Sequence, residues 1–309
     1  MRIYENISEL IGGTPLFEPK RIADKDELSA RLLLKLEYFN PAGSVKDRVG
    51  REMIDNAESE GLLGPGSVII EPTSGNTGVG IAAVAASRGY RVIITMPETM
   101  SEERKALIRA LGAELVLTEG GKGMLGAIEE AERIRDKTPG SIVAGQFSNP
   151  SNPAAHEKTT GPEIWRDTEG NVDIFVAGIG TGGTVTGVGR FLKAQKQSVR
   201  IIGVEPASSP FLTEGWAGAH GIQGIGAGFK PEVLNLEVLD GIIKVSDADA
   251  YKMCRTLARR EGLLAGISSG AVLSAALCLA KRRENEGKII VALLPDGGER
   301  YLSVPGYSE

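Results

Sequence analysis

The chain has 309 residues, which at about 150 residues per domain predicts one large or two medium-sized domains. Its 35 basic and 40 acidic residues give a net charge of −5, and no Lys/Arg-rich run interrupts this balance. Composition therefore argues against a protein that binds nucleic acid or an anionic membrane. Glycine is frequent, at 41 residues, roughly twice the average share of about 7%. This frequency indicates many tight turns or close approaches of the backbone.

The remaining composition also points away from several classes of protein. Cys254 and Cys278 form no C-x-x-C motif and cannot build a disulfide framework. The N-terminal segment lacks the basic and apolar regions of a secretory signal, and the longest apolar run, near 271–280, is too short for a membrane helix. We therefore expect a cytoplasmic protein. No cluster has metal-ligand spacing, and we interpret His156 as a structural hydrogen-bonding residue.

Short β-branched runs alternate with helical stretches along most of the chain. The expected strands are 67–71, 90–96, 114–118, 173–177, 200–205 and 288–294. The expected helices are 78–88, 101–111, 124–137, 184–195, 247–261 and 269–284, the second of them with Ser101 as its N-cap. Continuously apolar strands that alternate with helices predict parallel sheets covered on both faces. We expect an α/β protein with two sheets, and prolines between 146 and 162 mark the clearest boundary.

A lysine stands in the segment NPAGSVKDR at 40–48. Ser44 is a candidate N-cap, so Lys46 would lie just inside a helix start, where the helix dipole favours a neutral amine. A neutral lysine can attack an aldehyde, as lysines do with carbonyl substrates and with pyridoxal phosphate (PLP). A solvated lysine beside Asp47 is the alternative at this point.

Hydroxyl and amide side chains fill the segment TSGNTG at 73–78, between a predicted strand and a predicted helix. Free backbone N–H groups at a helix start suit a carboxylate or a phosphate group. An ordinary capping turn would have the same residues. A similar loop, GISSG at 266–270, opens a later helix, with Ser268 as its candidate N-cap.

Glycines at 178, 180 and 183 match G-x-G-x-x-G between a predicted strand and a predicted helix. Glu205 ends the next strand, where a ribose-binding carboxylate would stand, so a dinucleotide site is one interpretation. A loop with four glycines and two threonines suits a single phosphate group equally well. Dinucleotide folds also often carry this fingerprint on their first strand.

Six motifs occur in order along the chain: NPAGSVKDR, EPTSGNTG, GIGTGGT, QGIGAGF, GISSGA and LPDGGERY. Together they resemble the cysteine synthase (O-acetylserine sulfhydrylase) family of PLP-dependent enzymes of fold type II, over about residues 10–302. The resemblance implies two open, twisted, mostly parallel sheets flanked by helices, of the tryptophan synthase β type, with the active site between two domains. The implied domains are 36–149 and a combination of 1–35 with 150–309.

The resemblance also implies roles for individual residues. Lys46 matches the catalytic lysine that holds PLP. Asn76 matches the residue that bonds the 3′-oxygen of the cofactor, and Ser268 matches the partner of its pyridine nitrogen. The implied groups around the cofactor phosphate are Gly180, Thr181, Gly182, Gly183 and Thr184. The implied groups around the substrate carboxylate are Thr73, Ser74, Thr77 and Gln146.

The implied reaction is a β-replacement that makes L-cysteine and acetate from O-acetyl-L-serine and sulfide through an α-aminoacrylate. Lys46 would remove the α-proton as general base and return it after sulfide adds. A serine at the ring nitrogen supplies no negative charge, which weakens carbanion delocalisation and favours prompt loss of the β-leaving group over transamination. The scheme predicts ping-pong kinetics.

Other functions stay open at this point. Cystathionine β-synthase and O-phosphoserine sulfhydrylase activities use the same scaffold, although 217–229 contains no Arg or Lys to bind a leaving phosphate. Gly221 stands where many members of the family carry a larger residue, so the resemblance implies a differently shaped entrance to the active site. A dinucleotide enzyme and a regulatory binding protein without turnover are further alternatives. The family also implies a homodimer, and a site that can receive the C-terminal peptide of serine acetyltransferase, which ends in isoleucine, with its carboxylate at 73–77.

Overall fold

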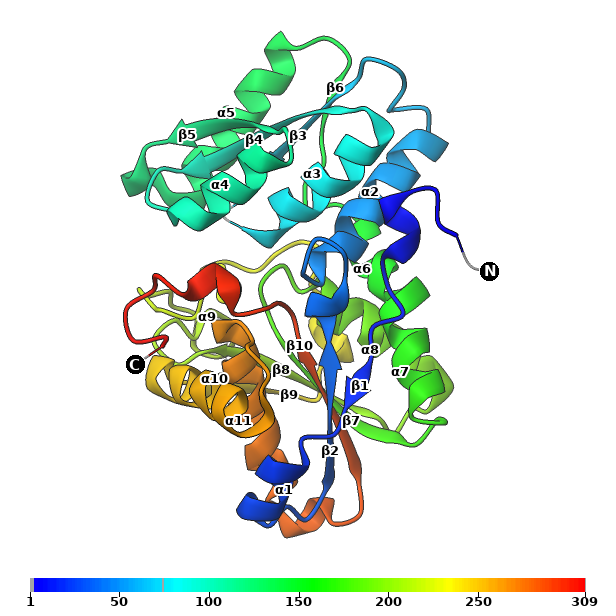
Figure 1. Ribbon diagram of the computed structural model, residues 1–309, viewed down its shortest axis with the longest axis vertical. Coiled ribbons are helices and arrows are strands. Elements are labelled where there is room, and N and C mark those ends of the chain that lie inside the picture. Colours follow the sequence, from blue (N-terminus) through cyan, green and yellow to red (C-terminus); the bar gives the residue numbers. More distant parts are fainter. Residues whose placement is uncertain (1–2, 74, 309) are drawn as a thin grey trace. The chain divides into compact units, whose positions relative to one another are not determined.

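The computed structural model describes residues 3–73 and 75–308. The chain divides into two compact units, and each has its own sheet (Figure 1). Unit 1 comprises Met1–Ile11 and Asn40–Ala155, and unit 2 comprises Gly12–Phe39 and His156–Glu309. Both units are α/β, which confirms the predicted fold class.

Unit 1 is built on a parallel four-stranded sheet in the order β5-β4-β3-β6. Its strands are β3 (Val68–Pro72), β4 (Arg91–Pro97), β5 (Glu114–Thr118) and β6 (Ser141–Val143). Its helices are η1 (Ile7–Leu10), α2 (Lys46–Ser59), α3 (Asn76–Arg88), α4 (Glu102–Ala110), η3 (Gly120–Lys122), α5 (Gly123–Lys137) and α6 (Ser151–Ala155).

The sheet of unit 1 is covered on both faces, and this explains its apolar strands. Ile69 of β3 packs in a cluster with Val49 of α2 and Ile81 of α3. The next residue, Ile70, packs on the opposite face with Ala131 of α5. Successive side chains of a strand point to opposite faces, so a strand buried on both sides is apolar at every position. In Figure 1, α5 accordingly lies across the sheet from α3 and α4.

Unit 2 contains a six-stranded sheet in the order β1-β2-β10-β7-β8-β9, parallel except for the β1–β2 pair. Its strands are β1 (Leu16–Phe17), β2 (Arg31–Leu36), β7 (Val172–Gly178), β8 (Arg200–Pro206), β9 (Gly241–Val245) and β10 (Ile289–Leu294). Its α-helices are α1 (Lys20–Asp26), α7 (Gly161–Asp167), α8 (Gly183–Gln195), α9 (Phe211–Glu214), α10 (Asp247–Glu261) and α11 (Ile267–Ala280). Single turns are η2 (Glu37–Phe39), the π-helix η4 (His156–Thr160), η5 (Leu236–Val238), η6 (Arg283–Asn285) and η7 (Glu299–Tyr301).

Helix α11 forms the centre of the unit 2 core, because it is apolar on every side and buried along nearly its whole length. It packs against α10 and against the sheet. The C-terminal segment also packs on this core. Tyr301 and Tyr307 are both buried there, and the Tyr307 hydroxyl donates to the carbonyl oxygen of Ala265 at 2.8 Å.

The predicted strands and helices are found within two residues of their expected ends, with one exception. The helix expected to reach residue 284 ends at Ala280, because residues 281–286 form a turn and η6. Ser101 occupies the N-cap of α4, but its side chain makes no capping hydrogen bond. Strands β1, β2, β6 and β9 were not among the predicted strands.

The main segment of unit 1 runs from Asn40 to Ala155, whereas the predicted domain runs from 36 to 149. The first residues belong to unit 1, because Arg51 Nη1 donates to the carbonyl oxygens of Ser8 and Ile11 at 3.3 and 3.2 Å. Helix α6 belongs to unit 1 because it packs on α2, whereas η2 continues from β2 of unit 2. Within 3–73 and 75–308, no helix combines the length and the apolar character needed to cross a membrane.

Candidate active site

Lys46 is the first residue of α2 and is partly buried. The N-cap position belongs to Val45, so the prediction of Ser44 as N-cap is wrong by one residue. Ser44 still supports the helix start, because its Oγ accepts a hydrogen bond from the Lys46 backbone N–H at 3.2 Å. The carboxylate of Asp47 is buried and accepts from the Ala42 N–H at 2.6 Å. Hydrogen bonds made by Ser44 before Lys46 and by Asp47 after it therefore hold the start of α2 in place.

Two glycines bring the first turns of α2 and α3 together. A Cβ atom at Gly80 would lie 2.6 Å from the carbonyl oxygen of Lys46, and one at Gly50 would lie 2.8 Å from the carbonyl carbon of Gly80. The two helices approach so closely because neither glycine has a side chain. Since α3 begins at Asn76, one turn before Gly80, this approach places Asn76 and Lys46 in one region of unit 1.

The loop between β3 and α3 is tied to the segment that follows β6. The hydroxyl of Thr77 donates to Oε1 of Gln146 at 2.6 Å. Nε2 of Gln146 donates to the carbonyl oxygen of Pro72 at 3.2 Å. Unit 1 thus joins Thr77 and Gln146 directly and holds Thr73 in the same loop, although 69 residues separate Thr77 from Gln146 in the chain. The predicted residue Ser74 lies outside the described residues.

A buried carboxyl group, that of Glu71, lies at the end of β3 directly before this loop. Burial raises the pKa of Glu71 to about 8, although hydrogen bonds from the Gly145 and Gln146 backbones and from the Gln146 side chain oppose the shift. The group is therefore a neutral acid at neutral pH. No sequence motif singles out Glu71, because one acidic residue at the end of an apolar strand carries no recognisable pattern.

The glycine loop of unit 2 joins β7 to α8. A Cβ atom at Gly180 would lie 2.4 Å from the carbonyl oxygen of Gly224, and Gly182 has a left-handed φ of +82°. Thr181 and Thr184 are buried, and Thr181 Oγ1 accepts from the Gly183 N–H at 3.4 Å. A glycine-rich loop with two threonine hydroxyls at the start of a long helix has the donors that a phosphate group requires. The loop therefore fits the cofactor phosphate.

His156 contacts this loop from η4. Its Nε2 lies 3.3 Å from Thr184 Oγ1, and its Nδ1 lies 2.9 Å from Thr160 Oγ1. The ring is fully buried. The prediction of a structural hydrogen-bonding residue missed that one of its partners belongs to the phosphate loop. That partner lies 28 residues away in the chain, so no local pattern could have found it.

Ser268 lies in the first turn of α11 and is buried. The N-cap of α11 is Gly266, so the prediction of Ser268 as N-cap is wrong. Cys254 donates from Sγ to the carbonyl oxygen of Gly266 at 3.2 Å, and burial raises the pKa of this thiol to about 12. The backbone N–H of Gly266 donates to the carbonyl oxygen of Asp296 at 3.0 Å. Contacts from α10 and from the end of β10 thus fix the start of α11.

Gly224, from the QGIGAGF motif, joins the two predicted cofactor elements of unit 2. Its carbonyl oxygen occupies the position beside Gly180, and a Cβ atom at Gly224 would lie 3.5 Å from Oγ of Ser268. Unit 2 therefore gathers the phosphate loop and Ser268 around one backbone segment. The backbone of this motif therefore sets the spacing between these two elements.

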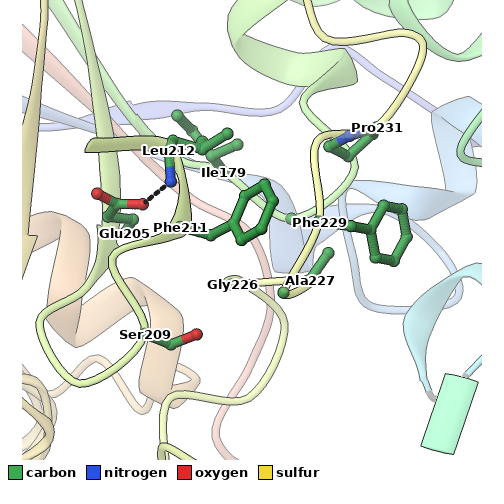
Figure 2. A pocket seen from close by; sticks show the side chains of 11 residues that line it. Ile179, Glu205, Ser209, Phe211, Leu212, Gly226, Ala227, Phe229 and Pro231 are labelled. Carbon is green, nitrogen blue, oxygen red and sulfur yellow. Dashed lines mark hydrogen bonds between the residues drawn. The ribbon is translucent and has the colours of Figure 1, made fainter. Parts of the chain in front are cut away.

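Glu205 does not present a free carboxylate for a ribose. Figure 2 shows its bond to the Leu212 N–H, at 3.0 Å, beside a pocket of about 240 Å³, partly open to solvent. Its other oxygen accepts from the N–H and the hydroxyl of Thr213. Both oxygens thus hold the start of α9. The dinucleotide interpretation loses its ribose-binding residue, and packing against Gly224 explains the glycine at 180 without a pyrophosphate.

The fold and these two groups of residues define the class of the protein. A family model described as pyridoxal-phosphate dependent enzyme matches residues 7–296, and the chain belongs to this family. The predicted family and cofactor are thereby confirmed.

Individual relatives narrow the class. A cysteine synthase of Staphylococcus aureus (strain Mu50 / ATCC 700699) is 50% identical over 305 residues, which cover 98% of this chain and 97% of that protein. A crystal structure of cysteine synthase from Entamoeba histolytica has a TM-score of 0.96 at 50% identity, covering 100% of this chain and 92% of that one. A hydrogen sulfide-producing enzyme of Fusobacterium nucleatum has a TM-score of 0.94 at 43% identity, with 97% and 100% covered.

Proposed function

We propose that the protein is a PLP-dependent cysteine synthase, which makes L-cysteine and acetate from O-acetyl-L-serine and sulfide. The observation that carries the proposal is the gathering of the phosphate loop and Ser268 around Gly224 in a chain 50% identical to a cysteine synthase. Unit 1 supplies the lysine and the carboxylate loop that this reaction also needs.

The cofactor would be held by residues of both sequence halves. The N–H groups and hydroxyls of Gly180, Thr181, Gly182, Gly183 and Thr184 would bind its phosphate. Ser268 would face its ring nitrogen, Asn76 its 3′-oxygen, and Lys46 its carbonyl carbon. When bound, PLP supplies an electron-withdrawing group that acidifies the Cα–H bond of the substrate.

Lys46 would move the proton in both halves of the reaction. Its Nζ takes the proton from Cα while acetate leaves from Cβ, and it returns the proton to Cα after sulfide has added to Cβ. The carboxylate of the substrate would be bound by Thr73, Ser74, Thr77 and Gln146. Fixing the carboxylate orients Cα toward the amine, which is what a general base needs.

Ser268 would favour replacement over transamination. Its hydroxyl is neutral and lies in the first turn of α11, where the helix dipole opposes a positive charge on the ring nitrogen. Because Ser268 would leave that nitrogen unprotonated, the bound cofactor would stabilise negative charge at the substrate Cα only weakly, which would favour loss of the β-leaving group over transamination. No Arg or Lys lies in 217–229, which favours an acetate over a phosphate leaving group.

The direct test is a two-step reaction of the PLP-loaded protein. O-acetylserine alone should release one acetate per active site, and later addition of sulfide should release one cysteine. Ping-pong kinetics should follow in the steady state. Release of acetate without cysteine, or turnover of serine with homocysteine instead, would reject this substrate pair.

Three further properties belong to the proposal. The protein is cytoplasmic and forms a homodimer. Sedimentation of the purified protein tests the oligomeric state, and a monomer at micromolar concentration would contradict the homodimer.

The carboxylate loop at 73–77 also receives the C-terminal peptide of serine acetyltransferase. Titration with a peptide ending in isoleucine should change the cofactor fluorescence, and the same peptide amidated at its C-terminus should not.

A further inference from the structure

Glu71 is buried beside the proposed carboxylate site, and the proposed reaction gives it no role. It follows the apolar run of β3, and its side chain has no exposed surface. Strand alternation places it on the same face as Ile69, the face covered by α2 and α3. A carboxyl group in such a position costs free energy unless its polar atoms are used.

The Glu71 carboxyl group anchors the segment that follows β6. Its Oε2 accepts from the Gly145 N–H at 2.8 Å, and Gln146 is the next residue of the chain. The segment needs an anchor here because β6 ends at this point. The N–H of Ala144 still pairs with the carbonyl oxygen of Ile70 at 2.9 Å, whereas Gly145 turns away with a φ of +72°.

The anchor fixes the side chain that bonds Thr77. Gln146 offers Oε1 to the Thr77 hydroxyl and donates from Nε2 to Pro72. Its backbone carbonyl oxygen accepts from Asn152 Nδ2 at 2.8 Å. These bonds need the Gln146 backbone to stay at the end of β3, which is where Glu71 holds it.

The second oxygen of Glu71, Oε1, is buried and has no hydrogen-bond partner among residues 3–73 and 75–308. An ionised carboxylate would leave that oxygen charged and unsatisfied, and burial accordingly raises the pKa of Glu71 to about 8. The anchoring is done by Oε2, which a neutral acid or an amide can also provide. A neutral anchor has a second advantage, since it does not repel a substrate carboxylate held a few residues away.

We propose that Glu71 is a positioning residue, a neutral anchor that holds Gln146 against Thr77 and so sets the affinity for the amino-acid substrate. The inference rests on the proposed role of Thr77 and Gln146 in binding the substrate carboxylate. It gives Glu71 no part in the proton transfers.

The test compares substitutions at Glu71 in the PLP-loaded enzyme. Glu71→Leu removes the acceptor and should raise the KM for O-acetylserine about tenfold while kcat changes less than about threefold, because the lost anchor weakens carboxylate binding and leaves Lys46 in place. Glu71→Gln keeps a neutral acceptor and should stay within about twofold of wild type on the same scale. Glu71→Asp withdraws the acceptor by one methylene and should raise KM about threefold, which gives a reading if the leucine variant does not fold.

A matched control lies on the other face of the same sheet. Thr95 is buried on β4, and its hydroxyl donates to the carbonyl oxygen of Ala127 in α5 at 2.7 Å. Thr95→Val should lower the melting temperature and leave KM unchanged. A purely structural role of Glu71 would give its leucine and aspartate variants the same profile as Thr95→Val, which would overturn the proposal.

Two other sets of results would also test the proposal for Glu71 and the carboxylate site on which it rests. Equal losses in Glu71→Gln and Glu71→Leu would show that a charged group is needed and would overturn the neutral anchor. Gln146→Ala and Thr77→Val test the underlying site separately. If neither changes KM, the proposed carboxylate site and this inference both fail. If both raise KM while Glu71→Leu does not, the inference alone fails.

Discussion

The two units contribute different kinds of chemical group to the proposed site. In unit 2 the phosphate loop is mainly backbone, and it depends on the absence of side chains where Gly180 meets Gly224. In unit 1 the carboxylate loop depends on side chains that bond each other across long stretches of chain, as Thr77 and Gln146 do. A backbone site is sensitive to any added Cβ atom, whereas a side-chain site is sensitive to single polar groups and to pH.

The largest effect should come from the lysine of unit 1. Lys46→Ala should lower the rate of cysteine formation by about 10³-fold or more, because it removes the general base. PLP should still bind, since the phosphate loop of unit 2 is intact. Cysteine production with O-acetylserine and sulfide, and cofactor absorbance, measure the two effects separately.

Lys193 provides the control for this variant. It pairs with Asp240 at 2.8 Å on the surface of unit 2. Lys193→Ala should keep wild-type turnover. Near-normal turnover in Lys46→Ala would remove Lys46 from the reaction and with it the main contribution of unit 1.

A smaller loss should follow from one methyl group in the unit 2 loop. In Gly180→Ala the new Cβ atom must displace the Gly224 backbone, which should weaken PLP binding by more than about tenfold. Fluorescence titration of the apo-protein with PLP measures this. Gly241→Ala is the control, because its Cβ atom would meet only Ile202 Cδ1 at 3.6 Å. Equal PLP affinity in both variants would contradict a backbone-built cradle.

Replacing His156, which bonds Thr184 of the phosphate loop, should reduce PLP affinity less than Gly180→Ala does. His156→Phe removes the bonds to Thr184 and Thr160 and should cost about 1–3 kcal/mol of unfolding free energy, with PLP affinity reduced a few-fold. Thr168→Val serves as the control, since the Thr168 hydroxyl donates to the Ile164 carbonyl oxygen at 2.8 Å. It should lose stability without losing PLP affinity. A His156 variant with the same profile would show that its bond to Thr184 does not support the cofactor.

The last expected effect is a pH dependence of stability in unit 1, spread over several pH units. The pKa of Glu71 is about 8 in the folded protein, above its ordinary value of 4.5, so the folded state binds more protons between these values. Stability should therefore fall as pH rises from about 4.5 to 8, by at most about 1.4 kcal/mol per pH unit from this group. Glu71→Gln should remove that part of the slope in denaturant titrations. Parallel pH profiles of the variant and the wild type would show that Glu71 ionises normally.

Local patterns predicted much of the fold and pointed to one half of the proposed site. Strands β3 and β7 each contain an unbroken apolar run, at 68–70 and 174–177, so their ends could be predicted within one residue. The phosphate loop is continuous in the sequence and therefore recognisable there. By contrast β2, with its six residues and two basic side chains, is a strand only because β10 and β1 pair with it on either side.

The sequence by itself determined the fold class, the family and the cofactor, because periodicity and six ordered motifs are properties of neighbouring residues. Tertiary structure decided which residues support them. Glu71 and Gly145 are 74 residues apart, and Thr184 and His156 are 28 apart, so their bonds exist only after the strands and helices have packed. The neutral state of Glu71 likewise follows from burial, which no local pattern records.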